Sequence, residues 1–186
     1  VTQRAPALRQ ASSLEETAIR LGLLAKAMPR TAPTPVGLML FGRQPQLIQP
    51  DWGVAAVAIR GTTLADPVSV RADLEGNLAS LVTQAMTFVR TQVEGRSSAA
   101  LAEGESEYPE AAVREAVVNA LVHRDFRRSG RVAIRIFADR IEVWSPGGLH
   151  EGLSDLSDLL SEGGVSHPRN PLLASAARSL GIGEQL

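Results

Sequence analysis

The sequence predicts an α+β protein, a two-layer sandwich of helices on a mixed sheet that is preceded by a small α/β linking subdomain. Two observations predict the two layers. An apolar stripe at helical spacing runs from Leu74 to Val93, and a second, almost wholly apolar helix is expected from Pro109 to His123. Apolar residues alternate in the segments 132–137 and 141–144, which predicts a β-hairpin with one buried face.

The composition excludes several classes of protein to which this chain could belong. The chain has 186 residues, 44% of them hydrophobic and 21% charged, with a net charge of −1 and no cysteine. A normal globular composition with no long apolar run indicates a soluble, cytoplasmic protein rather than a membrane protein. The lack of cysteine excludes disulfides and thiolate metal sites. The first residue is Val and the chain stops soon after Gly181, so we expect a piece of a longer protein.

The first 66 residues are expected to form a tail and the linking subdomain, and residues 67–186 are expected to form the sandwich. Ser13-Leu-Glu-Glu16 is a capping box that opens a helix to about Leu24, with Leu14 and Leu21 facing inward. The Pro- and Thr-rich segment 28–35 is expected to be a connector, 36–41 a helical turn closed by Gly42, and 54–59 a buried strand. A degenerate winged helix is an alternative for this part, although no basic recognition helix is visible.

In the second part, Gly95 is expected to end the first long helix, and a short strand is expected at 99–102. Asn170-Pro171 predicts a helix start, with Asn at the N-cap and Pro at the first position, and Gly181 closes that helix.

The helix 109–123 carries a narrow polar line. Glu115, Asn119 and His123 recur every four residues on a helix that is otherwise apolar. A carboxylate and a carboxamide one turn apart suit a divalent cation with its attached phosphates, or a water to be activated. A solvated helix face is the simpler reading, but such faces are usually broad and rich in Lys and Glu. Gly147 and Gly148, after the hairpin, could let a ligand approach the backbone, although an ordinary turn explains them equally.

Three segments together resemble a known family. They are Arg114 to Phe126, Asp139 to Leu149 and Arg169-Asn-Pro171. They resemble the GHKL-type, histidine-kinase-like ATPase domain of bacterial RecG-related or Schlafen/AlbA-type predicted transcriptional regulators, some of them described as ATP-dependent DNA helicase RecG-related proteins. The resemblance implies that residues 67–186 form a GHKL-like ATP-binding domain, a two-layer sandwich that is truncated at its C-terminal end. It also implies ATP and Mg²⁺ as ligands, with the DNA-binding part in a neighbouring domain outside this chain and a homodimer as a possible assembly.

The resemblance also implies roles for particular residues. Glu115 would orient or deprotonate the attacking water, and Asn119 would be both a nucleotide contact and the Mg²⁺ ligand. The remaining nucleotide-binding candidates that follow from the matched segments are His123, Asp125, Ser145, Gly147, Gly148, Arg169 and Asn170. Two departures stand out: Ser145 occupies the place of the adenine-binding Asp, and Leu149 that of a glycine. The second glycine motif of the family would begin just after Glu184.

Three functions therefore remain open from the sequence. The first is an ATP-binding, possibly ATP-hydrolysing, regulatory domain of a DNA-associated regulator. The second is a nucleotide-independent dimerisation or scaffolding module that positions a neighbouring DNA-binding domain. The third is direct contact with nucleic acid through Arg124, Arg127, Arg128 and Arg131, for which a solvated loop paired with local acids is the simpler explanation.

Overall fold

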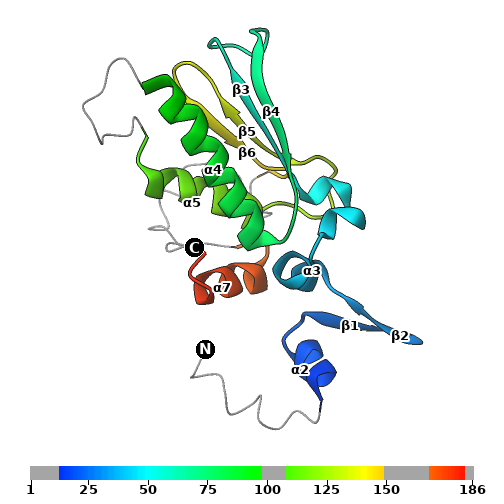
Figure 1. Cartoon of the computed structure of the whole chain (residues 1–186). Coiled ribbons are helices and arrows are strands. Elements are labelled where there is room, and N and C mark those ends of the chain that lie inside the picture. Colours follow the sequence, from blue (N-terminus) through cyan, green and yellow to red (C-terminus); the bar gives the residue numbers. More distant parts are fainter. Residues whose placement is uncertain (1–12, 98–107, 149–167, 183–186) are drawn as a thin grey trace.

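The computed structural model describes residues 13–97, 108–148 and 168–182 (Figure 1). A four-stranded sheet has the order β4-β3-β5-β6, formed by Val68–Leu74, Val54–Ile59, Val132–Ile136 and Ile141–Trp144. The central strands β3 and β5 are parallel, and both outer pairs are antiparallel. The sheet is therefore mixed, as predicted.

Two long helices, α4 (Leu78–Ser97) and α5 (Glu110–Val122), form the second layer over one face of the sheet (Figure 1). The buried residues of β3 and β5 alternate along each strand, and they meet the apolar stripes of both helices in one core. Leu81, Val117, Leu121 and Ile134 are fully buried in it. The predicted α+β sandwich is confirmed.

The region before the sheet is built from short elements. α2 (Leu14–Arg20) follows an N-cap at Ser13, whose hydroxyl accepts from the Glu16 N–H, so the predicted helix start is confirmed. α3 (Pro35–Phe41) ends at Gly42 as expected. Two 3₁₀ turns, η2 (Pro45–Leu47) and η3 (Pro50–Trp52), then lead into β3.

Several expectations for this region are wrong. The expected connector contains a β-hairpin, β1 (Leu24–Ala27) paired with β2 (Arg30–Pro33). The helix α2 stops at Arg20 and buries none of its residues, and Leu14 is 87% exposed. The strand 54–59 exists, but it lies at the centre of the sheet rather than in a linking subdomain. The boundary expected after residue 66 falls between β3 and β4, which are hydrogen-bonded partners.

The observed ends of α4, the first long helix, also differ from the expected ones. Leu74 belongs to β4, which the sequence did not predict, and the helix begins only at Leu78. Gly95 lies inside α4 rather than ending it. The last described helix is α7 (Pro171–Ser179), with its N-cap at Asn170 and its C-cap at Leu180. Gly181 follows with a φ of 67°. The strand expected at 99–102 lies outside the described residues.

Candidate functional site

The predicted polar line exists on α5 and lies on a partly covered face. Glu115, Asn119 and His123 are each partly buried. The Asn119 carboxamide donates from Nδ2 to Glu115 Oε1 at 3.1 Å. This bond orients the carboxamide so that Oδ1 is left for another donor or for a cation, and no residue in the described ranges donates to it. Glu115 and Asn119 thus form one preoriented oxygen-rich pair.

His123 stands at the C-cap of α5, where its N–H donates to the Asn119 carbonyl at 2.9 Å. Burial and the neighbouring positive charge of Arg169 lower the imidazole pKa, and Glu115 opposes them only in part. The side chain is therefore neutral at neutral pH, since its ordinary pKa of 6.5 is already below 7. A neutral imidazole can accept or donate a hydrogen bond beside Asn119.

Asp125 joins the end of α5 to the loop after β6. Its N–H donates to the Pro146 carbonyl at 2.8 Å, and its carboxylate accepts from the Arg127 N–H and guanidinium. The hydrogen bonds from Arg127 lower the Asp125 pKa to about 2. The Asp125 carboxylate is bound within its own turn, so it has a structural role in the observed geometry. The nucleotide contact expected at Asp125 stays a prediction.

The loop after β6 lies directly against α5. Ser145 Oγ donates to the Ala120 carbonyl at 2.7 Å. Its proton is therefore used by the helix, and the hydroxyl keeps only its acceptor lone pairs for a ligand such as an adenine amino group. Gly147 has a φ of 134°, and a Cβ there would lie 2.3 Å from Arg169 Nη1. The positive φ thus favours glycine at position 147, and a side chain there would also displace the Arg169 guanidinium.

Arg169 and Asn170 are predicted nucleotide contacts. Both contact the end of α5, and Arg169 also contacts residues 145–148 after β6, the glycine loop. Arg169 donates to the His123 carbonyl at 3.3 Å and to the Gly148 carbonyl at 2.8 Å. Asn170 Nδ2 donates to the carbonyls of Val122 and Arg124, both at 2.8 Å. Although Asn170 is the N-cap residue of α7, no side-chain capping bond to α7 is formed. The structure therefore brings most of the predicted site residues to the C-terminal end of α5, while Glu115 lies further back, near the middle of the helix.

The arginines proposed as nucleic-acid contacts largely bind other groups of the protein itself. Arg124 is fully buried, donates to the carbonyls of Asp51, Arg128 and Gly130, and lies over the Phe126 ring. Arg127 pairs with Asp125, and Arg131 pairs with Asp73 at 2.8 Å. Sequence reasoning missed the anchoring role of Arg124, because nothing in its local pattern shows that the Asp51 carbonyl, 73 residues away, accepts from its guanidinium.

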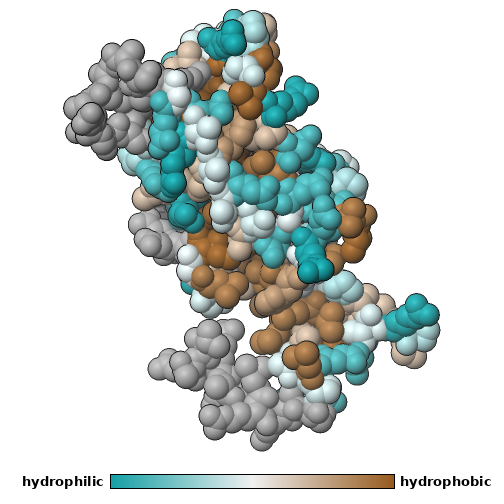
Figure 2. Space-filling view, viewed as in Figure 1, coloured by the Kyte–Doolittle hydropathy of each residue, from teal (hydrophilic) through white to brown (hydrophobic). Residues whose placement is uncertain are grey.

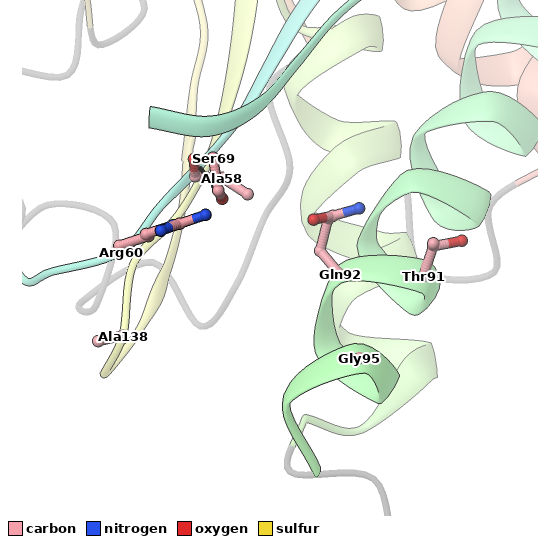
Figure 3. A pocket seen from close by; sticks show the side chains of 7 residues that line it. All are labelled: Ala58, Arg60, Ser69, Thr91, Gln92, Gly95 and Ala138. Carbon is pink, nitrogen blue, oxygen red and sulfur yellow. Dashed lines mark hydrogen bonds between the residues drawn. The ribbon is translucent and has the colours of Figure 1, made fainter. Parts of the chain in front are cut away.

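A surface cavity of ≈ 610 Å³ lies elsewhere, between the sheet and the C-terminal half of α4 (Figure 3). Arg60 and Gln92 extend into the space from opposite sides, and the remaining lining is mostly small. The cavity contains none of the predicted site residues. In the parts of the chain that the structure describes, no cluster of three or more acidic or histidine side chains could hold a metal ion by itself. A cation bound by Asn119 would thus need further oxygen ligands from a bound phosphate compound and from water.

The comparisons agree with this architecture. Residues 129–186 match the family model HATPase_c_4, described as "Putative ATP-dependent DNA helicase recG C-terminal". The match covers less than a third of the chain, and within residues 129–186 it confirms the resemblance to the RecG-related family that the sequence suggested.

Among solved structures, the DIP2311 protein from Corynebacterium diphtheriae has a similar fold, with a TM-score of 0.63 and 23% sequence identity. The match covers 97% of this chain and 29% of that chain, so the chain spans less than a third of the length of this neighbour. No curated protein matches the sequence. No helix within the described ranges is long and apolar enough to cross a membrane.

Proposed function

We propose that this ATPase-like domain binds ATP with Mg²⁺ beside the C-terminal half of α5 and regulates a DNA-associated protein of which the chain forms a part. The observation that carries the proposal is the oriented, half-buried Glu115–Asn119 pair on α5, the helix to which Ser145 of the loop after β6 is hydrogen-bonded at Ala120. Mg²⁺ usually takes one or two protein oxygens and completes its shell with phosphates and water. The free Asn119 Oδ1 meets that requirement.

Glu115 would act on water rather than on the metal. It accepts the Asn119 N–H through one oxygen and keeps the second for a water molecule near the phosphates. Such a carboxylate can orient the water or accept its proton during hydrolysis. Whether binding leads to turnover then depends on how well that water lines up with the terminal phosphate.

Calorimetric titration of the protein with ATP in the presence of Mg²⁺ tests the proposal. We expect saturable binding that weakens at least tenfold in Asn119→Ala, since the proposed cation ligand is then lost. Glu115→Gln should retain binding and lose any turnover. Glu94→Gln, an exposed substitution on α4, is the matched control and should change neither. Absence of heat at millimolar nucleotide would contradict nucleotide binding.

A second function has its own supporting observation. The side chains of Ser145, Arg169 and Asn170 hold backbone carbonyls of the protein itself, as expected of a module retained for its shape. In that case the domain would position a DNA-binding neighbour or a second copy without nucleotide. Intact assembly and activity of the full-length protein carrying Asn119→Ala would favour this function over the first.

A further inference from the structure

The C-terminal end of α5 has no local device that closes it. A helix leaves its last four carbonyls without intrahelical donors, and a glycine with positive φ commonly follows to satisfy them. Here the C-cap is His123 with a φ of −95°, and the next residue is the buried Arg124. The carbonyls of this end must therefore find donors from other parts of the chain.

Side chains from distant segments supply those donors. Ser145 donates to the Ala120 carbonyl, Asn170 to the Val122 carbonyl, and Arg169 to the His123 carbonyl. Asn170 also donates to the carbonyl of Arg124 through the same nitrogen. A cation at a helix C-terminus is favoured further by the helix dipole. The donors come from 25 to 48 residues away in the sequence.

Arg169 also holds the glycine loop. It donates to the Gly148 carbonyl as well as to the His123 carbonyl, and its Nη1 lies 2.3 Å from where a Cβ of residue 147 would be. The Asp125 N–H completes the connection by donating to the Pro146 carbonyl. At the start of α7, the Arg169 guanidinium thus connects α5 with the glycine loop, while the Asn170 carboxamide holds the end of α5 itself.

We propose that Arg169 and Asn170 are positioning residues that lock the end of α5 to the glycine loop, and so fix where Asn119 stands relative to Gly147. They act through backbone carbonyls rather than by touching the nucleotide. The proposal deepens the proposed function and rests on it for its effect on binding. The lock itself is a property of the fold and can be measured without nucleotide.

The test uses Asn170→Asp, which keeps the side-chain shape but replaces the donor by an acceptor facing two carbonyls. We expect faster hydrogen exchange at the amides of His123, Asp125 and Gly148. We also expect a Kd for Mg-ATP about tenfold higher, as for other residues that orient a metal ligand. Asn77→Ala is the control, because it removes the helix cap on Ser80 N–H of α4 but touches neither element of the site.

The outcomes separate the two proposals. If Asn170→Asp lowers the melting temperature like Asn77→Ala but leaves local exchange and Kd unchanged, the positioning role is overturned. If the wild-type protein binds no ATP, the proposed function fails, and the exchange rates alone decide whether the lock exists. Should Asn170→Asp not fold, Arg169→Gln provides the same measurements, since it removes the charge and the forked contact to His123 and Gly148.

Discussion

The sandwich and the N-terminal arm (residues 14–33, comprising α2, β1 and β2) differ in how they are held. The sandwich buries continuous apolar faces of two helices against four strands. The arm extends away from it, and its helix buries no residue (Figure 1). Brown apolar surface is visible on the lower part of the molecule in Figure 2. Within the arm, Leu14 and Met28 are almost fully exposed. A two-stranded hairpin and a seven-residue helix are marginal by themselves.

The comparison shows that local signals and packing contribute separately. The arm has clear capping, with Ser13 on α2 and Thr34 on α3, yet little burial. By contrast, α5 has no side-chain cap at either end from its own capping residues and is held by its core and by distant donors. Capping determines where a helix begins, while burial determines how strongly it is held.

The largest expected effect comes from a cavity in the sandwich. Leu121→Ala should lower the free energy of unfolding by about 3 kcal/mol, because the fully buried leucine packs between α5 and the sheet. Leu14→Ala in the arm should change it by less than about 0.5 kcal/mol. Urea denaturation of both variants measures the difference. Equal losses would contradict the distinction between the two regions.

A smaller loss of unfolding free energy is expected when the buried guanidinium of Arg124 is removed. Arg124→Met keeps much of the apolar stem but leaves the carbonyls of Asp51, Arg128 and Gly130 without this donor. We expect a loss of about 2 kcal/mol. Arg43→Met, at an exposed position between α3 and η2, is the control and should be nearly neutral. Chemical denaturation at neutral pH gives both values, and a neutral Arg124→Met would show that the anchor is dispensable.

Acid should weaken the sandwich through Asp125. The pKa of this carboxyl is lowered from 3.8 to about 2, chiefly by hydrogen bonds from Arg127. A depressed pKa stabilises the fold fully above the unfolded value, and this stabilisation is lost as the pH falls from about 4 toward 2. Asp125→Asn should therefore flatten this part of the stability profile. Denaturation at pH 7 and pH 3 measures it, and an unchanged slope would contradict the assigned cause.

The smallest effect is expected at the cap of the arm. Ser13→Ala removes the acceptor for the Glu16 N–H and should lower the helix content of the arm, with a cost of about 1 kcal/mol to α2 alone. Because the arm buries so little, the unfolding midpoint of the sandwich should stay unchanged. Circular dichroism and urea denaturation together show this. A clear drop in the midpoint would mean that the arm and the sandwich unfold as one unit.

The sequence by itself determined the elements whose signals are local. Apolar periodicity located α4, α5 and the β5–β6 hairpin. Capping residues located the start of α2, the end of α3 at Gly42 and the start of α7, because these signals lie within a few residues of one another. The polar line on α5 was visible for the same reason. The match to the RecG-related family model then confirmed the resemblance that the C-terminal segments suggested.

Only the tertiary structure decided how these elements share strands and donors. The strand β4 was missed because Leu74 was assigned to the helical stripe, although apolar and polar residues alternate from Val68 to Leu74; most of its residues are exposed at a sheet edge. The strand β3 could not be assigned to the sheet from its own sequence, since its parallel partner β5 lies more than 70 residues away. The end of α5 was likewise set by Ser145, Arg169 and Asn170, because free carbonyls accept any donor that folding brings close, whatever its distance along the chain.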